Sequence, residues 1–217
     1  VGCGVTRWCL CVASAFFCSC AIEILHSSQQ AITQFDFEAD GIDRIVTFDI
    51  ETTSLEPRDG SLVSIGVAIH DVGAPGADAE YTLFHRQAPD DESTLIDRAV
   101  EAIDSADADA LVSHNGIEFD FDYVEGRAGL LDHQFTPPSL HTRGQHYDTF
   151  LARKQATGSW VSLEDCLRAY GYPEPKTVWN GRPLDNTRFG EELGPTYLDT
   201  LRRAKSDCGA ELCSIID

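Results

Sequence analysis

Three short runs of β-branched and apolar residues follow one another with no helix between them, and this order most constrains the fold. The runs occupy residues 43–49, 62–70 and 81–85, and turn residues such as Gly60 and Gly73 separate them. Consecutive strands joined by short turns pair as an antiparallel meander. The sequence therefore predicts a sheet that begins with three antiparallel strands.

Helical periodicity appears only after the third run. One apolar stripe at helical spacing consists of Ile96, Ala99, Val100 and Ile103. A buried strand is predicted at 110–113, followed by a helix from Phe119 to Glu125 that Gly126 would end. This order predicts an α/β domain with a mixed sheet, antiparallel strands first and parallel strands later, flanked by helices. A doubly wound nucleotide-binding fold is excluded, because it would alternate strand and helix from the start.

Two later segments extend the predicted domain. Residues 146–150 read as a strand that enters a helix, which Asp148 would cap. Ser162 and Asp165 resemble a capping box that opens another helix, which Gly171 would end. The apolar stripe of that helix would consist of Leu163, Cys166, Leu167 and Tyr170. Residues 211–217 read as the opening of one more helix.

Two carboxylates, those of Asp49 and Glu51, come together at the end of the first predicted strand. Residues two apart in an extended chain point to the same side, and paired negative charge is costly there unless cations neutralise it. Carboxylate oxygens favour Mg²⁺ or Mn²⁺. The D-x-E pattern also occurs at 36–38 and 90–92, so its position after an apolar strand is what predicts a metal site.

A second acidic segment, residues 113–120 (SHNGIEFD), follows the fourth predicted strand. Together with residues 48–53 (FDIETT), it resembles the two first motifs of the DEDD 3′-5′ exonuclease superfamily, which has the ribonuclease H-like fold and includes the proofreading domains of DNA polymerases. The resemblance extends over about residues 43–207 and is greatest to archaeal exonucleases related to family-B proofreading domains. Residues 146–150 and 162–171 resemble later segments of the same family.

This resemblance implies a hydrolase that releases nucleoside 5′-monophosphates from the 3′ end of single-stranded nucleic acid, DNA in the first place. Asp49, Glu51 and Asp120 would hold two Mg²⁺ or Mn²⁺ ions. The terminal nucleotide would be bound by Thr52, Thr53, Leu55, Asn115 and Phe119. For Leu55 and Phe119, plain core packing is an equal alternative.

The family has a fourth acid on a late helix, with Tyr four residues or His five residues before it. The best-placed candidate is Asp207, but Arg203 and Arg202 occupy those positions. Either Asp207 is the fourth ligand and another group orients the water, or the ligand lies beyond Asp217. Two alternative functions stay open for this reason: a catalytically incomplete nucleic-acid-binding domain, and a ribonuclease H-like endonuclease.

The composition is strongly acidic: 36 Asp and Glu against 16 Lys and Arg give a net charge of −20, and only three of the bases are lysines. Such a balance is typical of proteins that work in molar salt, and it resembles the proteins of halophilic archaea and their viruses. An acidic protein of an ordinary cytoplasm is the alternative. The charge argues against binding a polyanion through a basic face, but a carboxylate site can meet phosphate through cations.

Residues 1–34 differ from the rest, because they contain one acid, Glu23, while the other 183 residues contain 35. Their apolar run, residues 8–22, is shorter than the ~20 residues of a membrane span. We interpret the segment as upstream sequence outside the fold, with a signal or membrane anchor as the alternative, and place the exonuclease domain at 35–217. Five of the eight cysteines lie here, and we expect reduced thiols, a cytoplasmic location and no stable membrane association.

Overall fold

The computed structural model describes residues 41–75, 78–169, 171 and 177–216, with side chains up to residue 205. The segment 1–34, interpreted above as an extension, lies outside the described residues, as does Tyr170. None of the helices in the described residues is long and apolar enough to cross a membrane.

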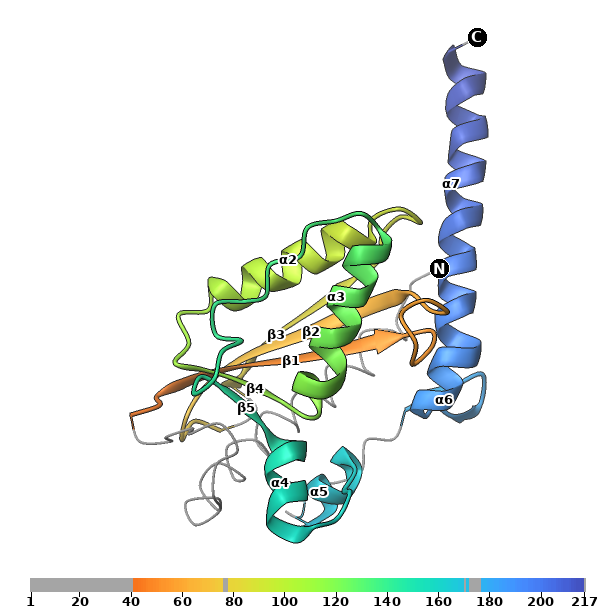
Figure 1. The fold of residues 1–217 in the computed structure, drawn as a ribbon. Helices are drawn as coiled ribbons and strands as arrows, with labels where there is room; N and C mark the ends of the chain where they lie inside the picture. Colours follow the sequence, from red (N-terminus) through yellow and green to blue (C-terminus); the bar gives the residue numbers. More distant parts are fainter. Residues whose placement is uncertain (1–40, 76–77, 170, 172–176, 217) are drawn as a thin grey trace.

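A five-stranded mixed sheet forms the centre of the domain, with the strand order β3-β2-β1-β4-β5 (Figure 1). Its strands are β1 (Arg44–Thr52), β2 (Leu62–Asp71), β3 (Glu80–His85), β4 (Ala110–Ser113) and β5 (His146–Asp148). β1, β2 and β3 pair antiparallel, whereas β4 pairs parallel with β1 and β5 pairs parallel with β4. The predicted meander and mixed sheet are confirmed.

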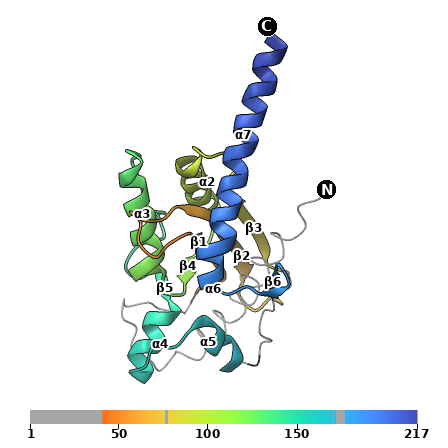
Figure 2. The same cartoon turned by 90° about the vertical axis from the view of Figure 1, so that its right-hand side faces the viewer.

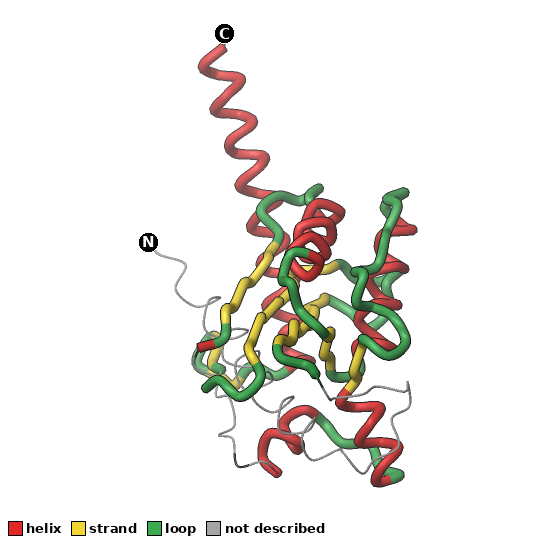
Figure 3. The backbone as a smooth tube through the Cα atoms, turned by 90° about the vertical axis from the view of Figure 1, so that its left-hand side faces the viewer, coloured by secondary structure: helices red, strands yellow, loops and turns green. Residues whose placement is uncertain are grey.

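The described chain also contains helices, two π-helical turns and two short strands. They are α2 (Glu92–Asp104), the π-helical turn η2 (Gly116–Asp120), α3 (Phe121–Leu130), α4 (Thr149–Thr157), α5 (Leu163–Ala169), β6 (Val178–Trp179), β7 (Arg182–Pro183), α6 (Asn186–Arg188), the π-helical turn η3 (Phe189–Leu193) and α7 (Gly194–Ile216). β6 and β7 form a separate two-stranded hairpin. Figure 3 shows the strands side by side between these helices.

The two faces of the sheet carry different cores because side chains alternate along each strand. Val46, Phe48 and Ile50 of β1 belong to a large cluster with residues of α2 and α3. Ile45 points to the other face and packs with Cys166 and Leu167 of α5. By the same alternation, Asp49 and Glu51 lie on the face of Ile45, away from α2 and α3.

A third, smaller cluster attaches the C-terminal helix to the sheet. Val63 of β2 packs with Phe189 of η3 and Leu198 of α7. The Tyr197 hydroxyl donates to the carbonyl of Arg86, and Lys205 pairs with Asp90 at 2.8 Å. These contacts lie within residues 194–205 of α7, and the helix then extends beyond the domain (Figures 1 and 2).

Several predicted boundaries were wrong. β1 runs on to Thr52, so Asp49 and Glu51 lie inside the strand and not at its end. The helix expected at Phe119 is preceded by η2, and α3 continues past Gly126 to Leu130. A Cβ atom on Gly126 would lie 3.0 Å from Cγ of Pro57, so this glycine allows close packing and does not end the helix.

The late helix also differs from the prediction. The helix expected to open at Glu211 is the last part of α7, which begins at Gly194. The predicted capping interaction at α5 is confirmed, because the backbone N–H of Asp165 donates to Ser162 Oγ at 3.2 Å. The stripe Leu163, Cys166 and Leu167 packs on the core as expected.

Candidate active site

The three acids singled out in the sequence are brought to one edge of the sheet. β1, β4 and β5 run parallel, so their carboxyl ends point the same way. Asp49 and Glu51 lie near the end of β1, and the chain leaving β4 reaches Asp120 through η2. Asp49 is paired across the strands with Gly66, which has no side chain to cover the carboxylate on that face.

Burial and mutual repulsion disfavour the charged form of each acid. Burial raises the pKa of Asp49 to about 6. Burial, and then the charge of Asp49, raises the pKa of Glu51 to about 8. The pKa of Asp120 is raised well above its usual value by burial first and then by the charges of Asp49, Asp148 and Glu51. The three carboxylates therefore act on one another electrostatically.

Asp120 has an unusual position for a carboxylate. Its side chain is buried, and its Oδ2 has no hydrogen-bond partner among the described residues. Leaving a buried charged oxygen unpaired is costly, and a bound cation would remove that cost. The side chains as they stand form no group of three or more metal-ligating residues within the described part of the chain. The chemistry of the donors, three buried carboxylates that repel one another, nevertheless suits a hard divalent cation.

The turn that carries Asp120 is held by Asp148, the last residue of β5. One carboxylate oxygen accepts the N–H of Asn115 at 2.9 Å, and the other accepts the N–H of Ile117 at 3.0 Å. Asp148 also caps α4, as predicted, by accepting the N–H groups of Phe150 and Leu151 at 3.0 and 3.2 Å. One side chain thus fixes both α4 and the turn before Asp120.

The backbone conformation of this turn explains why Asn and Gly stand at positions 115 and 116. Asn115 has a positive φ of 68°, a left-handed conformation that asparagine tolerates better than most residues. At Gly116 a Cβ atom would lie 2.5 Å from Ser113 Oγ and 3.3 Å from Asp120 Oδ2. Only glycine therefore lets the turn pass between Ser113 and the carboxylate without a shift.

A cavity of about 650 Å³ opens beside Glu51. Four of the five residues expected to bind a terminal nucleotide line it, namely Thr52, Thr53, Leu55 and Phe119. Leu55 is 76% exposed, so the alternative prediction that it packs in the core was wrong. Asn115 is not among the lining residues; its backbone N–H is bound to Asp148 instead.

The opposite wall of the cavity was not predicted. It consists of Asn186, Thr187, Gly190 and Glu191 from α6 and η3. These residues lie more than 130 positions after Glu51 and carry no motif, so no local pattern predicted them. Asp207, the tentative fourth ligand, lies on α7, and its side chain is outside the described part of the structure.

His114, next to the second acidic segment, has a structural contact. Its Nδ1 lies 2.9 Å from Thr149 Oγ1, and burial lowers its pKa to about 4. It is therefore neutral at neutral pH and joins the end of β4 to the start of α4.

Comparison with known proteins gives a family and a set of distant structures. Residues 46–184 match the family model described as RNase_H superfamily. The family B DNA polymerase from the archaeon Pyrobaculum calidifontis is similar at 19% identity with a TM-score of 0.49, over 64% of this chain and 20% of the polymerase. E. coli exonuclease I in complex with a dT13 oligonucleotide is similar at 12% identity with a TM-score of 0.45, over 75% of this chain and 43% of the exonuclease.

A further structure, exonuclease I in complex with the inhibitor BCBP, has 12% identity and a TM-score of 0.47 over 76% of this chain and 44% of the exonuclease. Each match thus spans less than half of the other protein's length. No curated protein matches the chain.

Proposed function

This chain belongs to the ribonuclease H superfamily, and from that premise we propose that it is a metal-dependent 3′-5′ exonuclease of the DEDD type acting on single-stranded nucleic acid. The observation that carries the proposal is that Asp49, Glu51 and Asp120 come to one edge of the sheet, where their charges act on one another and Glu51 lines the cavity. The motif resemblance at residues 48–53 and 113–120 supports the same reaction.

Asp49, Glu51 and Asp120 would hold Mg²⁺ or Mn²⁺. When bound, such cations lower the pKa of an attacking water and stabilise the leaving oxygen. The neighbouring cation would also keep all three carboxylates ionised at neutral pH, where burial and repulsion otherwise favour protonation.

The cavity residues would position the 3′-terminal nucleotide. Leu55 and Phe119 offer apolar surface for the base, whereas Thr52 and Thr53 offer hydroxyl groups to the sugar and phosphate. Glu51 lines the same cavity, so a nucleotide held there would place its phosphodiester near the acids. DNA is the substrate we expect first.

The test is digestion of a 5′-labelled single-stranded DNA by the full chain in 1 M KCl with Mn²⁺. We expect a ladder of products shortened from the 3′ end, and a loss of rate of at least about a hundredfold in Asp49→Asn. Glu101→Gln is the matched control, because Glu101 is an exposed acid on α2. Asp207→Asn, run beside them, tests whether that acid is the fourth ligand.

Each other result points to a different function. Cleavage of a strand whose 3′ end is blocked would indicate an endonuclease. Binding of the strand without digestion by any variant would indicate a binding domain.

Metal binding has a readout that needs no activity. Mn²⁺ should raise the thermal unfolding temperature of the wild type, because a ligand that binds only the folded state stabilises it. Asp120→Asn removes one ligand and should abolish most of this shift. An equal shift in both proteins would place the cation elsewhere.

A further inference from the structure

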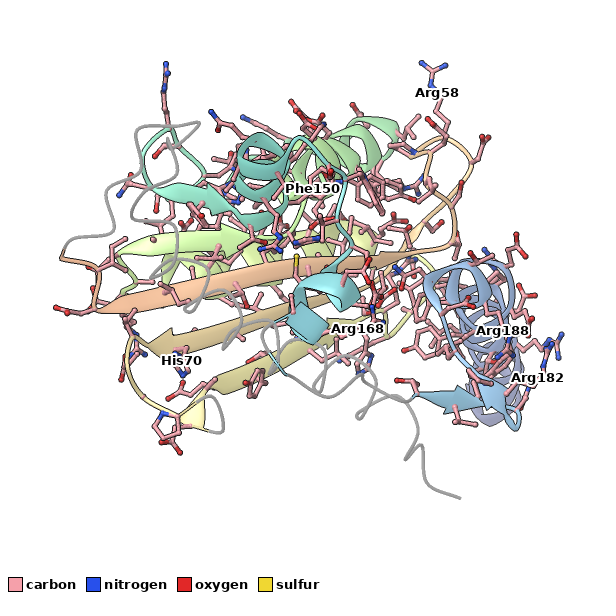
Figure 4. All side chains as sticks on the ribbon, turned by 90° about the horizontal axis from the view of Figure 1, so that it is seen from below. Arg58, His70, Phe150, Arg168, Arg182 and Arg188 are labelled. Carbon is pink, nitrogen blue, oxygen red and sulfur yellow. The ribbon has the colours of Figure 1, made fainter. Side chains whose placement is uncertain are left out.

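An exposed tryptophan stands at the surface near the candidate active site. Trp160, in the loop between α4 and α5, is 74% exposed. Its ring meets Phe150 edge to face, with centroids 5.6 Å apart at 73°. Phe150, labelled in Figure 4 at the start of α4, is buried and meets the His114 ring in the same way at 5.6 Å and 74°. We call Trp160, Phe150 and His114 the aromatic platform.

The platform is connected to the turn that carries Asp120. His114 is hydrogen-bonded to Thr149 Oγ1 at 2.9 Å and to the backbone of Val161, the residue after Trp160. The next residue, Asn115, begins the turn held by Asp148. The loop bearing Trp160 is thus fixed to the same short segment that positions the buried carboxylate.

A positively charged side chain, that of Lys154, lies beside these rings. Lys154 Nζ is 5.5 Å from the centroid of the Phe150 ring, and its ion pair with Glu118 is long, at 3.9 Å. Lys154 is one of only three lysines in a chain with a net charge of −20. Aromatic surface next to a positive charge is the combination by which proteins hold unpaired nucleotides.

Single exposed apolar residues are common on protein surfaces and need no function. Trp160 differs because its exposed ring packs on the buried ring of Phe150. Its loop is also hydrogen-bonded, through the backbone of Val161, to His114 beside the candidate active site. The charge of the chain adds a reason for stacking. Attraction between bases and an aromatic ring is not screened by salt, whereas attraction of phosphates to Lys and Arg is, and here the net charge repels them.

We propose that Trp160 stacks against an unpaired base of single-stranded nucleic acid, with Lys154 beside the adjoining phosphate. The inference rests on the proposed function for its ligand and adds a contact outside the cavity and the three acids. The strand would then be held at two places, by its 3′ end in the cavity and by a more distant base at Trp160. Because every base has an aromatic face, DNA and RNA share the required chemistry.

The experiment measures binding of fluorescein-labelled dT12 and rU12 to the full chain by anisotropy, in EDTA so that metal-dependent digestion does not interfere. Trp160→Ala should raise the Kd roughly tenfold, within the range known for loss of one stacked base. Trp160→Phe should keep most of the affinity. Leu130→Ala is the matched control, because Leu130 is an apolar residue of α3 that is 52% exposed.

Salt dependence separates stacking from charge. The ratio of the Kd of Trp160→Ala to that of the wild type should be the same in 0.1 M and 1 M KCl. Lys154→Gln should weaken binding in 0.1 M KCl only. A Trp160→Ala protein that binds both strands as tightly as the wild type would overturn the proposal, and so would a wild type that binds neither.

The failure of this inference can be told apart from failure of the proposed function. Binding that depends on Trp160 in a protein that digests nothing would support the platform and remove the exonuclease. Digestion with an unchanged KM for dT12 in Trp160→Ala would support the exonuclease and remove the platform. Sedimentation of the wild type as a dimer and of Trp160→Ala as a monomer would instead make this surface an interface between copies of the chain, which would also overturn the proposal.

Discussion

At the scale of single residues, Asp148 shows how much local order one carboxylate can provide. It accepts four backbone N–H groups, two from the turn at Asn115 and Ile117 and two from the first turn of α4. Burial raises its pKa, and the four hydrogen bonds oppose that rise. The carboxylate is therefore a positioning group, distinct from the three acids that we assign to the metal site.

Asp148→Asn should destabilise the protein by about 2 kcal/mol, because the amide keeps one acceptor oxygen and turns its NH₂ toward other donors. Asp185→Asn is the matched control. Asp185 caps α6 through a single bond to Arg188 N at 2.8 Å and is exposed, so we expect a loss of less than about 1 kcal/mol. Urea unfolding followed by circular dichroism measures both. Equal losses would mean that the turn before Asp120 does not depend on Asp148.

His146 gives the protein a pH dependence that can be tested. It is buried between Ser113 Oγ and His141 Nδ1, each 2.8 Å away. Burial, and then repulsion from His141, lowers its pKa to about 3. Between about pH 6.5 and pH 3, His146 is therefore protonated in the unfolded chain but neutral in the folded protein. In that interval the contribution of His146 to the free energy of unfolding should fall by about 1.4 kcal/mol for each unit of decrease in pH.

His146→Gln, which cannot titrate, should lack this loss. Asp49 and Glu51 have raised pKa values, and their protonation stabilises the folded state as the pH falls, which is the opposite sign. The informative quantity is therefore the difference between wild type and variant in the free energy of unfolding, measured in urea at pH 7.5 and pH 5. A difference that does not change with pH would contradict the assignment.

At the scale of elements, a buried ion-pair network connects parts that are distant in the sequence. Glu92, at the start of α2, pairs with Arg86 after β3 at 3.0 Å and with Arg127 of α3 at 2.7 Å. It also accepts the N–H of Leu62 at 2.9 Å, while Arg127 donates to the carbonyl of Pro57 at 2.8 Å. The network thus fixes the β1–β2 loop, which lines the cavity, against α2 and α3.

Glu92→Gln should cost about 3 kcal/mol, because it leaves Arg127 without its carboxylate partner, whereas Arg86 keeps its ion pair with Asp91 at 2.6 Å. Glu101→Gln, on the exposed side of the same helix, should change stability by less than about 0.5 kcal/mol. Chemical unfolding of the two variants in parallel makes the comparison. A small loss in Glu92→Gln would show that water reaches the arginines and that the network contributes little.

Periodicity predicted the elements better than it predicted their ends. The β-branched runs predicted all three antiparallel strands and β4, because β1, β2 and β4 are largely buried and β3 alternates between exposed and more buried positions. Gly126 was misread as a helix end, because its small size serves a contact with Pro57 that only the tertiary structure reveals. The β6–β7 hairpin has two residues in each strand, too few for any period to be visible.

At the scale of the whole molecule, the candidate site could be predicted only where its residues belong to the two acidic segments near the ends of β1 and β4. Asp49, Glu51 and Asp120 were predicted from the motif resemblance of residues 48–53 and 113–120, and the parallel strands β1 and β4 bring these two segments to one edge of the sheet. The cavity wall from Asn186 to Glu191 is brought there by α6 and η3 through packing on Val63, which no local pattern records. The sequence thus predicted the proposed chemistry and half of the cavity.

The net charge of −20 makes stability depend on salt for the molecule as a whole. Raising KCl from 0.1 M to 1 M shortens the screening length from about 10 Å to about 3 Å, so repulsion among surface carboxylates should nearly vanish. We expect the free energy of unfolding to rise steeply in this interval and then to level off. If salting-out of apolar surface were the cause, the free energy of unfolding would instead continue to rise with the KCl concentration.

Urea unfolding at a series of KCl concentrations measures the shape of this curve, and sucrose serves as an uncharged control. A free energy of unfolding that stays flat or falls with KCl would mean that local ion pairs, such as Lys205 with Asp90 and Arg44 with Asp71, outweigh the repulsion. Exposed ion pairs of this kind weaken in salt.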